Sequence, residues 1–88
     1  MIEKFISCGV KVTAVQFIDE NDVRIVNRIC ELVGVPGARV MDNRIRFGLA
    51  GAWMSLYKSQ WVVRFGPEIY DHIFLDDKVF KALFTEVS

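Results

Sequence analysis

The chain has 88 residues, of which 52% are hydrophobic, and its 11 basic residues balance its 11 acidic residues. A chain of this length fills one core, so we expect a single domain over residues 1–88. Zero net charge excludes a global attraction to nucleic acid or to an anionic membrane, and it favours self-association.

The first predicted element is a strand over residues 10–18, which is rich in β-branched residues and partly alternates between apolar and polar positions. An acidic cluster at 19–22 then opens a helix. Asp19 or Asn21 is expected to accept hydrogen bonds from the free N–H groups of the first turn.

One half of this helix's circumference is apolar, which predicts a helix over about 22–33 that packs on a sheet containing the first strand. Gly34 is expected to end the helix in the left-handed conformation. The expected buried residues are Val26, Ile29, Cys30 and Val33.

The middle of the chain predicts short antiparallel strands. Residues 38–41 and 44–47 flank Asp42-Asn43, a pair typical of a β-hairpin turn. Residues 48–52 are small and apolar, which indicates a turn or a bulge, and 53–57 predicts a further strand.

The last third predicts two strands, a short helix and an edge strand. Asp76 or Asp77 is expected to cap the helix. The expected elements are strands over 61–65 and 68–74 around a Gly66-Pro67 turn, a helix over about 77–84 and an edge strand over 85–87. Because the elements are segregated rather than alternating, they predict an α+β fold with a mostly antiparallel sheet.

No targeting or membrane segment is visible. Residues 1–5 carry charges where a signal peptide needs an apolar run, and the longest charge-free run, residues 47–57, is about half as long as a membrane span. We therefore expect a soluble, cytoplasmic protein. Cys8 and Cys30 form no C-x-x-C motif, so we expect free, buried thiols.

Two ends of the chain resemble a family of small tailed-phage and prophage proteins. The first is Val12-Thr13-Ala14-Val15-Gln16-Phe17 followed by Asn21, which resembles a V-x-A-V-Q-[FW] start. The second is Ser59-Gln60-Trp61-Val62-Val63-Arg64, Glu68-Ile69-Tyr70, Asp76-Asp77-Lys78-Val79-Phe80 and Glu86-Val87, which resembles the end pattern G-D-W-[IV]-[IV]-[KR], E-x-Y, D-x-F and E-x-V.

The chain departs from that pattern where Ser59-Gln60 replaces Gly-Asp and where Asp76 replaces Lys-Pro. Residues 34–57 are not covered by the resemblance. It implies a phage-type protein in the cytoplasm of a bacterial host, and it implies no catalytic residues.

Catalytic and metal chemistry have little support in the sequence. His72 is the only histidine, and strand alternation places it on the face opposite Asp71, so a set of three or four metal ligands is not expected. No nucleophile-elbow motif and no phosphate-binding glycine loop is present. We expect no enzymatic activity, no metal and no cofactor.

The charges are unevenly distributed. Residues 37–66 hold five basic residues against one acidic residue, together with several aromatic residues. Arginines beside aromatic rings suit phosphates, bases or acidic protein surfaces. A solvated hairpin with Trp61 in the core is the simpler explanation, because five charges are few for a protein that binds nucleic acid. The candidate binding residues are Arg39, Arg44, Arg46, Arg64, Trp53 and Tyr57.

Three functions remain as expectations. The first is a non-catalytic accessory protein that binds and modulates a host protein, for example a component of host defence. The second is a nucleotide-binding or nucleic-acid-binding module that uses the basic middle segment, and the third is a small virion component. The high apolar fraction also predicts a homodimer or a larger homo-oligomer.

Overall fold

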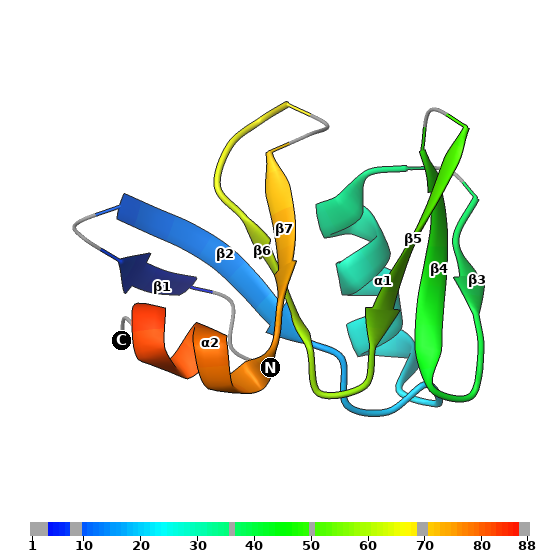
Figure 1. Ribbon diagram of the computed structural model, residues 1–88, viewed down its shortest axis with the longest axis horizontal. Coiled ribbons are helices and arrows are strands. Elements are labelled where there is room, and N and C mark those ends of the chain that lie inside the picture. Colours follow the sequence, from blue (N-terminus) through cyan, green and yellow to red (C-terminus); the bar gives the residue numbers. More distant parts are fainter. Residues whose placement is uncertain (1–3, 8–9, 36, 50, 69–70, 87–88) are drawn as a thin grey trace.

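The computed structural model describes residues 4–7, 10–35, 37–49, 51–68 and 71–86. Two antiparallel sheets and two helices make an α+β fold, as the sequence predicts (Figure 1). The elements are β1 (Lys4–Ser7), β2 (Val10–Gln16), α1 (Val23–Val33), β3 (Arg39–Val40), β4 (Arg44–Leu49), β5 (Ala52–Tyr57), β6 (Trp61–Arg64), β7 (His72–Leu75), α2 (Asp77–Leu83) and β8 (Thr85–Glu86).

The strands divide into two sheets instead of forming one. The larger sheet has the order β7-β6-β2-β1-β8, and the smaller has the order β3-β4-β5. At the centre of the larger sheet, β2 pairs with β6 so that Val15 lies opposite Val62. The predicted strand over 68–74 is shorter than expected, since β7 begins at His72; residues 69 and 70 lie outside the described residues.

The first helix begins at a different cap from the one predicted. The side chain of Asp22 accepts a hydrogen bond from the backbone N–H of Ile25 at 3.2 Å. Asp19 instead accepts from the backbone N–H of Asn21 at 2.9 Å, so its carboxylate is engaged in the turn before the helix. Gly34 ends the helix at φ +74°, as predicted.

The main core lies where α1 meets both sheets. Val26, Ile29 and Val33 are buried, as predicted, whereas Cys30 is only half-buried; Cys8 lies outside the described residues. The buried residues around α1 come from β2 and the residue after it, and from β6, β4 and β5: Val15, Phe17, Val62, Ile45, Phe47 and Leu56.

The opposite face of the larger sheet carries a second core under α2. The rings of Trp61 and Phe80 stack with centroids 3.9 Å apart and planes 10° from parallel. Asp76 occupies the N-cap position, but its carboxylate makes no capping hydrogen bond. It accepts from Nε2 of Gln60 at 2.9 Å, so the predicted cap is a link between α2 and the turn before β6.

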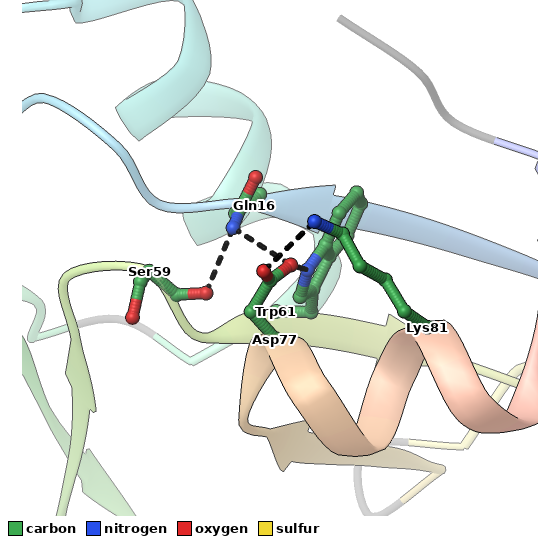
Figure 2. A network of polar contacts seen from close by, with 5 residues as sticks. All are labelled: Gln16, Ser59, Trp61, Asp77 and Lys81. Atoms are coloured by element: carbon green, nitrogen blue, oxygen red, sulfur yellow. Dashed lines mark hydrogen bonds and ion pairs between the residues drawn. The ribbon is translucent and has the colours of Figure 1, made fainter.

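A polar network ties the start of α2 to the larger sheet (Figure 2). Oδ1 of Asp77 accepts from Nε1 of Trp61 at 2.8 Å and from Nε2 of Gln16 at 3.2 Å. Lys81 pairs with the other carboxylate oxygen at 3.0 Å, and Gln16 also donates to the carbonyl of Ser59. The hydrogen bond from Trp61, with Lys81 second, lowers the pKa of Asp77 below its ordinary value of 3.8.

This network predicts that acid weakens the fold. A carboxyl group with a depressed pKa in the folded chain stabilises it above the unfolded pKa and loses that contribution as the pH falls through the folded value. Asp77→Asn keeps an acceptor oxygen for Trp61 but removes the charge. We expect the variant to melt below the parent at neutral pH, and the gap to narrow as the pH falls below the ordinary carboxyl pKa of 3.8. A gap of constant size across thermal melts from neutral to acidic pH would contradict this assignment.

Neither α1 nor α2, the two helices of the described residues, has the length and apolar character needed to cross a lipid bilayer.

Candidate functional site

The smaller sheet has one buried face and one exposed face. On β4, Ile45 and Phe47 are fully buried against α1, which turns Arg44 and Arg46 to the opposite side. The sequence predicts this alternation correctly. On β5, Leu56 is buried in the same core. The exposed side, here called the Arg-aromatic face, consists of Arg39, Arg44, Arg46, Trp53 and Tyr57.

Strand register brings these five residues together. Arg39 on β3 lies directly opposite Arg46 on β4, and Arg44 lies directly opposite Tyr57 on β5. Trp53 is opposite Gly48, one position along the same face from Arg46. Segments up to 18 positions apart, from Arg39 to Tyr57, thus share one surface.

Trp53 is held in place although it is exposed. Its side chain is 60% exposed, and the Arg46 guanidinium lies over its ring at 4.6 Å from the centroid. Gly48 lies beside the ring, and a Cβ there would make an ordinary van der Waals contact with it at 3.5 Å. A cation–π contact at an exposed site contributes about 0.5–1 kcal/mol, enough to orient both groups.

Arg44 is anchored in a similar way. Its Nη1 donates to the hydroxyl of Tyr57 at 3.3 Å, and its guanidinium carbon lies 5.9 Å from the centre of that ring. Its Nε also donates to Sδ of Met41 at 3.4 Å. Both guanidinium groups of β4 therefore lean across the sheet towards β5.

The arginines of this face keep their charge uncompensated. Within the described part of the chain, no carboxylate lies within ion-pair distance of Arg39, Arg44 or Arg46. The neighbouring Lys58 is different, because it pairs with Glu20 at 2.6 Å. That contact raises the pKa of Lys58 and lowers the pKa of Glu20. Of the four basic residues on and beside this face, only the three arginines therefore lack a carboxylate partner among the described residues.

Arg64, the fourth candidate arginine, lies in the larger sheet. It follows Val62 on the face of β6 that meets α1, and its Nη1 donates to the carbonyl of Leu32 at 2.8 Å. Its Nη2 donates to the carbonyls of Pro67 and Glu68 at 3.0 and 2.6 Å. The last carbonyls of a helix lack partners within the helix, so Arg64 ties the end of α1 to the turn after β6. The structure does not bring it to the Arg-aromatic face.

Other reactive side chains lie apart from this face. His72 is on β7 and Cys30 is on α1, where burial raises the pKa of the thiol and keeps it protonated at neutral pH. Among the residues that the structure describes, no three His, Cys, Asp or Glu side chains converge as metal ligands would.

The sequence interpretation missed two contributors to the face. Gly48 was expected in a turn or bulge but lies in β4, directly opposite Trp53 and beside its ring. Met41 was assigned only to a strand and supplies a contact to Arg44. The alternation of exposed and buried positions over residues 44–47 continues to position 48. That pattern is the signal in the sequence that could have placed Gly48 in the strand, on the same side as the two arginines.

Comparisons with family models, with curated proteins and with solved structures each returned no match.

Proposed function

We propose that the chain is a non-catalytic accessory protein of the phage type, and that it binds and modulates a host protein through the Arg-aromatic face. The observation that carries this proposal is the exposed Trp53 ring fixed under the Arg46 guanidinium. Trp, Tyr and Arg are the residue types that dominate binding energy at protein interfaces. A surface that combines all three is suited to an acidic patch on a partner.

The placement of Arg39 supports a role in binding over a role in folding. Like charges directly opposite each other on neighbouring strands destabilise a sheet, and Arg39 faces Arg46 in this way. No carboxylate of the described residues offsets that repulsion. An acidic partner would remove it on binding.

The resemblance of both chain ends to small tailed-phage proteins supports the phage-type part of the proposal, and it implies the bacterial cytoplasm as the site of action. A host-defence component is one target that fits such a protein.

A nucleotide or nucleic acid is the second candidate ligand. The arrangement of Arg44 and Arg46 beside aromatic rings suits phosphates and stacked bases. Two observations weigh against it: the chain has zero net charge, and Arg46 already covers one face of the Trp53 ring. A base stacking on Trp53 has to use the other face.

The composition of the purified protein tests the choice between these ligands. When the protein is purified from a bacterial host, we expect a second polypeptide to co-purify with it. We expect the ultraviolet absorbance spectrum of the sample to be that of protein without nucleotide. A co-purifying nucleotide or nucleic acid, released by denaturation and identified by mass spectrometry, would favour the second candidate.

The predicted homo-oligomer is a separate proposal. Ile73 on β7 and both Val79 and Leu83 on α2 are 43–52% exposed, and they lie outside the Arg-aromatic face. We expect light scattering to show a dimer at high micromolar concentration, and Val79→Ser with Leu83→Ser to shift it to a monomer. A parent protein that is monomeric under those conditions would exclude this assembly.

A further inference from the structure

Strand β5 lies at one edge of the smaller sheet, since the order is β3-β4-β5 (Figure 1). An edge strand has a row of backbone N–H and C=O groups that point away from its neighbour, and a strand of another molecule can pair with them. Unlike β3, which spans two residues, β5 spans six.

The hydrogen bonds of the hairpin fix which groups point outward. The N–H of Lys58 donates to the carbonyl of Asn43, so the backbone of Lys58 faces the β4 side. By strand alternation, Leu56, Met54 and Ala52 face the same side, and Tyr57, Ser55 and Trp53 face the open edge.

One end of this edge is already closed. The N–H of Tyr57 donates to Oε1 of Gln60 at 2.8 Å, and its carbonyl accepts from the N–H of Gln60 at 3.0 Å. The outward backbone groups of Trp53 and Ser55 have no such partner among the described residues. Two donors and two acceptors therefore remain at the centre of the edge.

The positive charges of Arg44 and Arg46 favour an added strand that carries carboxylates. Neighbouring strands lie about 4.8 Å apart. Side chains of an added strand that point to the exposed side of the sheet would therefore lie next to Trp53, Ser55 and Tyr57. The guanidinium groups of Arg44 and Arg46 lean over β5 towards this position. Carboxylates at alternating positions of the added strand would meet them.

A second copy of the chain fits this edge poorly. Two β5 strands paired antiparallel around Ser55 would join two Arg-aromatic faces into one continuous surface, which doubles the number of uncompensated arginines on it.

We propose that β5 binds an extended acidic segment of the partner protein as an added strand. Its backbone pairs with Trp53 and Ser55, and its alternating carboxylates contact Arg44 and Arg46. This inference rests on the proposed function and specifies how the same face recognises its partner.

The test compares Ser55→Pro with Ser55→Ala. Proline removes the outward N–H of Ser55 and is tolerated on the solvent side of an edge strand, whereas alanine keeps that donor. The probe is a short, labelled, acetylated peptide of alternating Glu and Val, measured by fluorescence anisotropy. We expect proline to weaken binding by about tenfold or more and alanine to leave it unchanged.

A second probe keeps the test independent of how well the proline variant folds. The same peptide, methylated on every backbone nitrogen, has the same charges but no donors, and we expect the parent protein not to bind it. Equal binding of methylated and unmethylated peptides would overturn the strand-addition proposal, as would a folded Ser55→Pro variant that binds like the parent.

The outcomes also separate this inference from the proposed function. If Ser55→Pro binds normally while reversal of Arg44 and Arg46 abolishes binding, the face is correct and the added strand is wrong. If neither change affects binding of the host protein, the proposed function fails as well. Binding of short oligothymidine in place of the peptide overturns both.

Discussion

Replacing Trp61 by alanine is expected to lower the free energy of unfolding by about 3–5 kcal/mol, the usual cost of truncating a large aromatic residue in a core. Trp61 is 8% exposed, stacks on Phe80 and donates to Asp77, so the change removes packing and a hydrogen bond together. Chemical denaturation followed by circular dichroism measures the loss. A variant that unfolds at the denaturant concentration of the parent would place Trp61 outside the core.

The chain holds its own control for this experiment, because it has a second tryptophan in the opposite environment. Trp53→Ala removes an exposed ring and one cation–π contact, so we expect a stability loss under about 1 kcal/mol. Trp61→Phe separates the two contributions in the core, since it keeps a ring against Phe80 but removes the donor to Asp77.

Reversing both arginines of β4, by Arg44→Glu with Arg46→Glu, is expected to weaken partner binding by at least about a hundredfold. Both side chains lie on the Arg-aromatic face while their neighbours on β4 are buried, so the change leaves the core untouched. The stability of the sheet is expected to stay level or to rise, because Arg39 then faces Glu at position 46. Isothermal titration calorimetry with the co-purified partner protein measures the change in binding, and thermal melts measure the change in stability.

A matched control reverses two exposed charges elsewhere. Arg24→Glu with Lys78→Glu gives the same net charge from positions on α1 and α2. We expect this control to bind like the parent. Normal binding by the β4 variant would exclude the Arg-aromatic face as the contact surface, whereas equal losses in both double variants would indicate an effect of net charge alone.

Elements with a strong periodic pattern could be predicted from the sequence. The apolar face of α1, the Asp42-Asn43 hairpin and the burial of Ile45 and Phe47 all follow from local alternation, and the structure confirms them. Local patterns do not determine which strands pair with each other. The sequence therefore indicated an antiparallel sheet but not its division into two, and it did not indicate β1.

The same reason explains the mixed outcome for the candidate site. Arg44 and Arg46 share a strand, so their common face follows from spacing two residues apart. The contact of Arg46 with Trp53 depends on the β4–β5 register, and the position of Arg64 depends on how β6 packs against α1. Both features depend on tertiary packing. A count of charges over residues 37–66 therefore cannot show that Arg46 belongs to the Arg-aromatic face and that Arg64 does not.

The smaller sheet lies, in sequence, between two paired strands of the larger sheet, β2 and β6. Thr13 and Arg64 lie opposite each other, so the chain between them leaves the larger sheet, builds α1 and β3–β5, and returns to the same place. The entropy of closing such an excursion grows only with the logarithm of its length, by about 0.6 kcal/mol for each doubling. Residues added at the Asp42-Asn43 turn would therefore cost little at the central register. The exposed face of the smaller sheet can change in the same way while its buried face keeps its contacts with α1.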